Sequence, residues 1–268
     1  MNNDKWLVAF PAMLLIIAAC SSSFTRQPAA PPPLKLVWAD EFNYTGLPDS
    51  TKWSYDMGGH GWGNHELEYY TSKRAENARV ENGSLIIEAR KEKWQNNDYT
   101  SARLVTKGKA DWQYGKIEIK AKLPKGTGTW PAIWMLASKD SMKWPADGEI
   151  DIMEHVGFNQ GYIHGSVHCT KYNHVIHTQK TDTVIVKDCS ETFHVYSLEW
   201  TADSIKVAVD GNVFFRFASE HTYDAWPFDN KMHLLLNLAV GGDWGGAKGI
   251  AQDIWPQRME VDYVRVYQ

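Results

Sequence analysis

The chain has 268 residues, of which 43% are hydrophobic and 22% are charged, and its formal net charge is -4. This length and composition fit one large soluble domain with a substantial core. The charge balance provides neither the basic footprint of a nucleic-acid-binding protein nor an acidic tail, so we expect no nucleic acid among its partners.

The first twenty residues differ from the rest. Lys5 is followed by an uncharged apolar run over residues 6–19, which has the length of a signal-peptide core and is too short to cross a membrane comfortably. The run ends in IAAC, which resembles the bacterial lipobox, whose cysteine is lipidated. We therefore expect a signal peptide over 1–19, a lipid anchor on Cys20, and a location in the cell envelope, at the outer membrane or cell surface. The alternative is an uncleaved anchor helix with an incidental cysteine.

Residues 20–33 form a Ser-rich and then Pro-rich stretch. Such a composition cannot bury a core and makes a semi-rigid tether. The folded domain is therefore expected over 34–268. If Cys20 carries lipid, export leaves Cys169 and Cys189 as a pair in an oxidising compartment, where a disulfide is the default. The alternative is two free buried thiols.

From residue 34 onward the hydrophobic pattern has a period of two. Segments 83–90 and 114–124 alternate between apolar and polar residues, as half-buried antiparallel strands do. Residues 204–217 form two apolar runs joined at Asp210-Gly211, a hairpin signal because such turns need positive φ. A last strand is expected over 259–268. No stretch beyond the signal peptide shows a sustained helical period with caps at both ends, so we expect an all-β, two-sheet sandwich, with a closed barrel as the alternative.

Twelve of the thirteen tryptophans follow residue 34, and many lie in Gly-rich or Pro-rich surroundings. Examples are GHGWGN (59–64), GTGTWPAIW (126–134), KWPADG (143–148) and GGDWGG (241–246). Tryptophans in such loops suit a platform on which the C–H face of a sugar ring stacks. About half of them could equally be core residues.

The segment GEIDIMEH places Glu149, Asp151 and Glu154 within six positions. Carboxylates packed this closely titrate as a coupled set, in which one proton is held to a higher pKa. A retaining glycosidase needs such a set, with an ionised nucleophile and a protonated acid. Strand parity, however, turns Glu154 away from the other two. A β-bulge at Ile152-Met153 would restore it to their face. The alternatives are a calcium site and a solvent-facing strand.

The motif GEIDIMEHVG resembles the signature of glycoside hydrolase family 16 in its E-x-D-x-x-E form. Seven further stretches resemble the family in order: DEF (40–42), GGHGWGNHELEYYT (58–71), YTSARLVTKGK (99–109), YGKIEIKAKLPKGTGTWPAIWML (114–136), HGSVH (164–168), NLAVGGDW (237–244) and DYVRVY (262–267). Together they are similar to the bacterial laminarinases of the family. The resemblance implies a β-jelly-roll sandwich with a concave substrate cleft and retention of anomeric configuration.

By motif position, the resemblance implies that Glu149 is the nucleophile, Glu154 the general acid/base, and Asp151 the residue that tunes the nucleophile. It also implies a set of residues that hold sugar near the cleavage point: Asn64, Arg103, Trp130, Trp134, His168 and, more weakly, Trp244. Arg103 could instead be a surface residue and Trp134 a core residue. The histidines near Cys169 match no zinc spacing.

Family members often hold one structural calcium ion on the convex face. The positions that match are Glu41, the carbonyl of Gly83, and Asp262. No cofactor is implied for the chemistry itself, and a monomer is expected.

The leading hypothesis is a lipid-anchored, endo-acting retaining glucanase that cuts internal β-1,3 bonds in laminarin-like polysaccharides. A second is a family enzyme for another polymer: mixed-linkage β-glucan, agarose or carrageenan. A third is a non-catalytic glucan-binding surface lipoprotein. Transglycosylation also remains open, because any acceptor hydroxyl can intercept a covalent glycosyl-enzyme.

Overall fold

The computed structural model describes Met1 and residues 33–268, and the chain divides into the units Met1–Pro33 and Leu34–Gln268. The predicted signal peptide, Cys20 and nearly all of the linker lie outside the described residues. No helix in the described part of the chain is long and apolar enough to cross a membrane.

Seventeen strands, two 3-10 turns and one short helix make up the described domain. The strands are β1 (Leu36–Asp40), β2 (Ser54–Asp56), β3 (Glu68–Tyr70), β4 (Ala78–Glu81), β5 (Ser84–Trp94), β6 (Asn97–Ser101), β7 (Arg103–Val105), β8 (Gly115–Lys122), β9 (Thr129–Ala137), β10 (Glu149–Glu154), β11 (Tyr162–His168), β12 (Lys180–Ile185), β13 (His194–Trp200), β14 (Ser204–Val209), β15 (Asn212–Ala218), β16 (Met232–Val240) and β17 (Gln257–Tyr267). The helical elements are η1 (Gly157–Asn159), η2 (His174–Ile176) and α1 (Gly242–Gly245).

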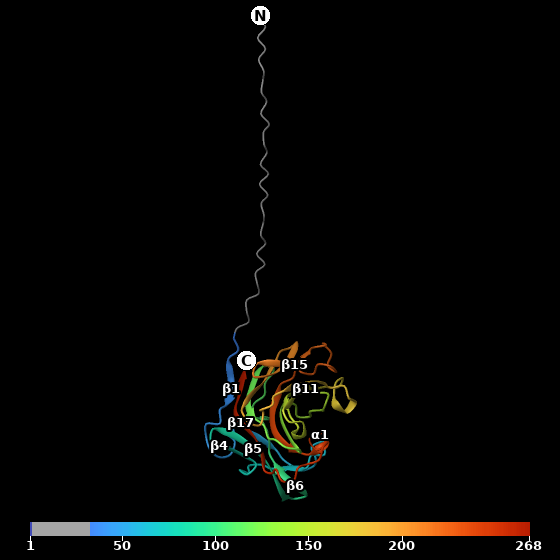
Figure 1. Ribbon diagram of the computed structural model, residues 1–268. Coiled ribbons are helices and arrows are strands. Elements are labelled where there is room, and N and C mark those ends of the chain that lie inside the picture. The colour runs from blue at the N-terminus through green and yellow to red at the C-terminus, as the bar shows by residue number, and fades with distance from the viewer. Residues whose placement is uncertain (2–32) are drawn as a thin grey trace. The chain divides into compact units, whose positions relative to one another are not determined.

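The strands form two sheets that pack face to face as curved layers (Figure 1). The seven-stranded sheet has the order β12-β11-β10-β9-β16-β7-β2. The ten-stranded sheet has the order β15-β14-β13-β8-β17-β5-β6-β3, with β1 beside β17 and β4 beside β5. Every pairing is antiparallel except β3 with β6. The prediction of an all-β, two-sheet sandwich is confirmed, and the sheets do not close into a barrel.

The core lies between the sheets because alternate residues of each strand point inward. The strand predicted over 114–124 shows this directly: Ile117, Ile119 and Ala121 of β8 are buried, and Glu118 and Lys120 between them are only half-buried. The predicted hairpin is also present, with φ of 50° at Asp210 and 78° at Gly211 between β14 and β15.

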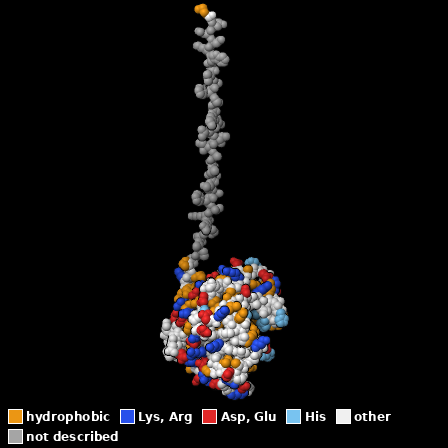
Figure 2. Space-filling view, viewed as in Figure 1, with side chains coloured by type: hydrophobic (Ala, Val, Ile, Leu, Met, Phe, Trp, Pro, Cys, Tyr) orange, Lys and Arg blue, Asp and Glu red, His pale blue; other side chains and the backbone are white. Residues whose placement is uncertain are grey.

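Strand β5 differs from its predicted half-buried pattern, because five consecutive residues from Leu85 to Ala89 are buried. The outer face is covered here by charged side chains. Arg79 on β4 lies 3.0 Å from Glu88, and Arg258 on β17 lies opposite Glu88 in register. On the face of the domain seen in Figure 2, basic and acidic side chains are interspersed rather than gathered in one field.

The predicted calcium ligands do not form a free set of oxygens. Arg265 donates two 2.8 Å hydrogen bonds to the carboxylate of Glu41, and Lys120 lies 2.7 Å from the carboxylate of Asp262. Gly83 lies in the turn between β4 and β5. Because each carboxylate already has a basic partner, these residues do not fit a calcium cage as they are arranged here. The calcium ion stays a prediction.

The predicted disulfide is wrong in this structure, since Cys169 and Cys189 are both free, buried thiols. Cys169 directly follows the last residue of β11. Cys189 lies at the other end of that strand, with its Sγ 3.5 Å from Nε2 of Gln160. A strand as long as β11 spans roughly 20 Å, whereas a disulfide needs Cα atoms within about 7 Å of each other. Cysteine parity alone could not reveal this separation.

Reduction should therefore leave the stability of the domain unchanged. We expect a reductant to shift the thermal midpoint by less than about 1 °C, because loss of a native disulfide would cost roughly 2–5 kcal/mol and several degrees. Alkylation of the denatured, unreduced protein, followed by peptide mass spectrometry, should label both Cys169 and Cys189. Labelling of this pair only after reduction would contradict the structure.

Candidate active site

Strand β10 lies near the middle of the seven-stranded sheet and changes register where the bulge was predicted. Against β9, Asp151 pairs with Trp134 and Met153 with Ile133, so two steps along β10 match one step on β9. Against β11, Asp151 pairs with Ser166 and Glu154 with His164. The extra residue falls within Ile152-Met153, and both of these side chains are fully buried. The bulge is confirmed.

The bulge places all three acids on the outward face of the sheet. Glu149, Asp151 and Glu154 pair with Leu136, Trp134 and Ala132 of β9, which are spaced by two and therefore share a face. The opposite face carries the core residues Ile150, Ile133 and Met135. Regular pairing would have directed Glu154 into that core instead.

Asp151 is the deepest of the three acids: it is buried, whereas Glu149 and Glu154 are half-buried. The side chain of Asp151 is 3% exposed and that of Glu149 is 14% exposed, so Asp151 lies beneath the surface that a substrate would reach. His168, opposite Glu149 on β11, places Nε2 at 3.2 Å from Asp151 Oδ2 and 3.7 Å from Glu149 Oε1. One ligand atom from each of Glu149, Asp151 and His168 lies within 4.8 Å of the other two, a spacing that also suits a cation.

Burial raises the pKa of each of the three acids to about 8. For Glu149 and Glu154 the charge of Asp151 raises the pKa further. A positive charge on His168 lowers the pKa of both Glu149 and Glu154. Because like charges in one buried site cannot all form together, the cluster loses its protons in steps. It can therefore hold one ionised and one protonated carboxyl at the same pH.

Each outer acid also has a tryptophan donor. Trp144 Nε1 donates to Glu149 Oε2 (2.9 Å), and Trp130 Nε1 donates to Glu154 Oε1 (3.0 Å). The Trp130 ring meets Trp244 edge to face, with centroids 5.5 Å apart. These contacts fix the two carboxylates and line the acids with indole rings.

Toward the β2 edge of the sheet, Arg103 is held between two indole rings. Its guanidinium carbon lies 4.7 Å from the ring centroid of Trp62 and 4.7 Å from that of Trp134. Its Nε lies 3.0 Å from Asp56 Oδ2, and only 9% of the residue is exposed. Trp134 is fixed in turn, since its Nε1 donates to Asn237 Oδ1 (2.7 Å). Arg103 thus supports an aromatic surface on the sheet.

Asn64 belongs to the loop before β3 and donates from Nδ2 to Glu66 Oε1 (3.2 Å). Its carbonyl accepts from the N–H of Asp243 (2.7 Å), which ties this loop to α1 and hence to Trp244. The structure thus brings all nine predicted catalytic and sugar-binding residues to the outward face of the seven-stranded sheet or the loops beside it.

Three contributors were not predicted as site residues. Trp144 and Trp62 stand in tryptophan segments noted above, but no spacing rule connects either of them to its partner. His164 lies opposite Glu154 on β11 and 4.9 Å from the Trp244 ring, with its Nε2 buried and unpartnered among the described residues. The parity of HGSVH puts His164 on the face of His168, and this signal could have identified it.

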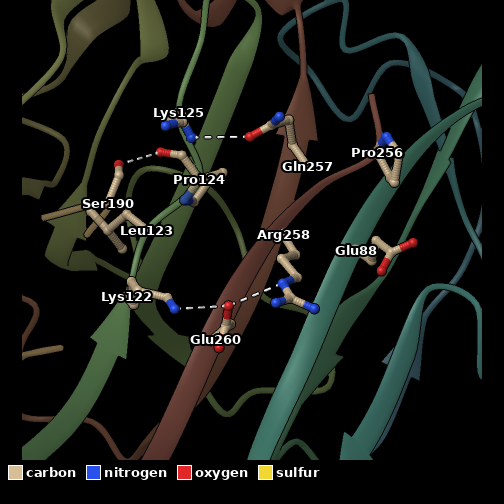
Figure 3. A pocket seen from close by; sticks show the side chains of 10 residues that line it. All are labelled: Glu88, Lys122, Leu123, Pro124, Lys125, Ser190, Pro256, Gln257, Arg258 and Glu260. Carbon is tan, nitrogen blue, oxygen red and sulfur yellow. Dashed lines mark hydrogen bonds and ion pairs between the residues drawn. The ribbon is translucent and has the colours of Figure 1, made fainter. Parts of the chain in front are cut away.

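A depression of about 370 Å³ lies on the outer face of the other sheet, across the core from the three acids. Figure 3 shows that Glu260 joins two of its basic side chains, since it lies 3.0 Å from both Lys122 and Arg258. The N–H of Lys125 donates to Gln257 Oε1 (3.2 Å). Because its two acids, Glu88 and Glu260, are each paired with arginine or lysine and its lining holds no reactive cluster, this depression is not the active site.

The burial of the Asp151 carboxyl should lower the free energy of unfolding where this group is ionised in the unfolded chain. An acid whose pKa is raised on folding destabilises the folded state as pH rises from its unfolded pKa, near 4, to its folded pKa, about 8. Asp151→Asn should therefore raise the thermal midpoint at pH 8 by roughly 5 °C and change it little at pH 4. Asp262→Asn, at a half-buried acid that is already paired with Lys120, should show no such gain. An equal gain at both pH values would contradict the assignment.

Comparison with known proteins identifies the family. Residues 65–265 match the model "Glycosyl hydrolases family 16". A curated beta-glucanase from Rhodothermus marinus is 51% identical over all of this chain and 97% of its own length. The crystal structure of the laminarinase from Rhodothermus marinus has a TM-score of 0.87 at 53% identity, covering 88% of this chain and 98% of that one.

A non-specific endo-β-1,3(4)-glucanase, crystallised as a mutant with an oligosaccharide at its active site, has a TM-score of 0.86 at 51% identity and covers 90% of this chain and 96% of that one. The chain belongs to glycosyl hydrolase family 16.

Proposed function

We propose that the protein is an endo-acting, retaining β-glucanase that hydrolyses internal β-1,3 bonds of laminarin-like polysaccharides. The observation that carries the proposal is the bulge in β10, which sets Glu149 and Glu154 on one face with buried Asp151 between them. Two carboxyls in different protonation states, facing one substrate, are what double displacement requires.

In the first step the ionised carboxylate of Glu149 attacks the anomeric carbon. The bond between that carbon and the bridging oxygen breaks, and protonated Glu154 gives its proton to the departing oxygen. The product is a glycosyl ester on Glu149 and a shortened glucan with a free hydroxyl. Trp144, by donating to Glu149 (2.9 Å), directs this carboxylate toward its target.

In the second step Glu154, now ionised, accepts a proton from a water molecule. The water oxygen attacks the anomeric carbon, the ester bond breaks, and Glu149 leaves as a carboxylate. Two inversions give net retention. Asp151 and His168 lie directly against Glu149, and their charges set the pKa of Glu149 in each of the two steps. An acceptor hydroxyl that replaces the water would give transglycosylation.

The substrate is held by aromatic surfaces on both sides of the acids. Trp130 and Trp244 stand at the Glu154 end, and Trp62 and Trp134 stand around Arg103 toward β2. Sugar rings present apolar C–H faces that stack on such rings, and Asn64 offers an amide to their hydroxyls.

Mixed-linkage β-1,3-1,4-glucan is the second candidate substrate. The similar enzyme described as a non-specific endo-β-1,3(4)-glucanase favours this reading. The binding-only reading is weaker, because all three acids and their tryptophan donors are in place. Anchoring through Cys20 stays a prediction, which mass spectrometry of the membrane-extracted N-terminal peptide would test.

The roles of the two glutamates can be separated with azide. Glu149→Ala and Glu154→Ala should each lower turnover of laminarin at least roughly a thousandfold with the fold intact, since each loses a group that acts in the transition state. Azide should then restore activity with opposite stereochemistry. Glu149→Ala should give the α-glycosyl azide by direct attack, and Glu154→Ala the β-glycosyl azide by attack on the ester.

NMR of the azide products identifies the anomer formed, and wild type with azide provides the control. A Glu154→Ala variant with near-normal activity on laminarin would contradict the assignment of the acid. Identical azide anomers from both variants would contradict the division of roles.

The position of Arg103 between two indole rings predicts an effect on substrate binding. Arg103→Lys keeps the charge but loses the planar group that stacks between Trp62 and Trp134. We expect KM for β-1,3-linked oligosaccharides to rise roughly tenfold and kcat to change less, because the aromatic surface loses its support. Arg216→Lys, on the exposed side of β15, is the matched control. An unchanged KM for Arg103→Lys would remove Arg103 from the binding surface.

A further inference from the structure

A second hollow lies at the edge of the sandwich, away from the three acids. It has a volume of about 640 Å³, within the range of small-molecule sites. Met57 lines it one residue after β2, the edge strand of the seven-stranded sheet, and Tyr69 lines it from β3, the edge strand of the ten-stranded sheet. The hollow therefore lies beyond the Arg103 end of the catalytic face.

The main feature of this hollow is an exposed indole. Trp94 ends β5 and is 36% exposed, about as much as Trp144 beside the acids. Its ring is supported by Arg74, whose guanidinium carbon lies 4.8 Å from the ring centroid. The ring of Tyr69 lies beside it, with centroids 6.4 Å apart and planes inclined by 43°.

The support beneath Trp94 is rigid. Arg74 donates to both oxygens of Glu92, at 2.6 and 3.1 Å, and to Asn77 Oδ1 at 2.8 Å. Asn77 is fully buried. Because the guanidinium is held by several acceptors, the indole is ordered before any ligand arrives, which lowers the entropy lost on binding.

The chemistry of the hollow favours a neutral ligand with hydroxyl groups. The charge of Arg74 is compensated by Glu92, and Glu76 lies 3.4 Å from its Nε. Lys73 also lines the hollow, so two basic side chains, Lys73 and Arg74, face two carboxylates, Glu76 and Glu92, and no net positive charge is left there for a phosphate or a sulfate. Tyr69 Oη and Trp94 Nε1 have no hydrogen-bond partner among residues 33–268, so both remain available to sugar hydroxyls.

We propose that this hollow is a second carbohydrate site, in which a β-glucan segment stacks on Trp94 and hydrogen-bonds to Tyr69. The proposal rests on the substrate class argued above. A site that holds polymer apart from the catalytic acids keeps the enzyme on its substrate between cleavages, because the second contact is made at a high effective concentration.

The test measures retention of the full chain on particles of an insoluble linear β-1,3-glucan, with Glu149→Gln present in every sample to suppress hydrolysis. Trp94→Ala should weaken retention roughly tenfold, the effect of truncating one aromatic anchor. Trp94→Phe should restore part of the loss. Tyr223→Ala, at an exposed aromatic outside the hollow, should bind like the parent. The difference should persist in 0.5 M salt, which screens charge but not stacking.

A second arm uses the active enzyme and a soluble β-1,3-linked hexasaccharide. Trp94→Ala should leave kcat/KM within about twofold of wild type, since one oligosaccharide in the cleft does not need the second site. Unchanged retention, or a hexasaccharide loss as large as the retention loss, would overturn the proposal. Failure of the wild type to cleave the hexasaccharide would count against the enzymatic function instead, since the retention arm needs no hydrolysis.

Discussion

The rest of the site depends on one interruption in the pairing of β10. A regular strand would place Glu154 among the core residues of the sandwich, where an unpaired carboxylate costs several kcal/mol. The extra residue at Ile152-Met153 turns the strand so that both hydrophobic side chains enter the core and Glu154 emerges beside Asp151. The same irregularity thus serves packing and chemistry, and a bulge is a stable way to combine them.

Burial of the three acids lowers the stability of the fold but also serves the chemistry of the site. Removing the three acids from water raises the pKa of each, and the charge of Asp151 raises the pKa of Glu149 and Glu154 further. The fold would gain stability from neutral residues there. The same repulsion keeps a proton available for the leaving group while a neighbouring carboxylate is ionised, which a solvated pair of glutamates near neutral pH could not do.

Much of this could be predicted from the sequence, for identifiable reasons. Period-two alternation fixed β8, and Asp210-Gly211 fixed a hairpin, because both signals are local. The family motif located the acids and most cleft residues. Contacts set by loop conformation were out of reach, such as Trp144 with Glu149 five residues later and Trp62 with Arg103. The partners of Glu41 and Asp262 were also out of reach, because they depend on register between distant strands. The disulfide prediction failed similarly, since two cysteines twenty residues apart in sequence lie at opposite ends of β11.

The most direct test of the account is to trap the covalent intermediate. A 2-deoxy-2-fluoro glycosyl fluoride built on a β-1,3-linked disaccharide slows both steps, the second more than the first, so that the ester accumulates. Peptide mapping of the inactivated protein should find one sugar, attached to Glu149. A sugar on Asp151 or Glu154, or turnover that releases the α-anomer without any ester, would contradict the arrangement of acids that the bulge in β10 creates.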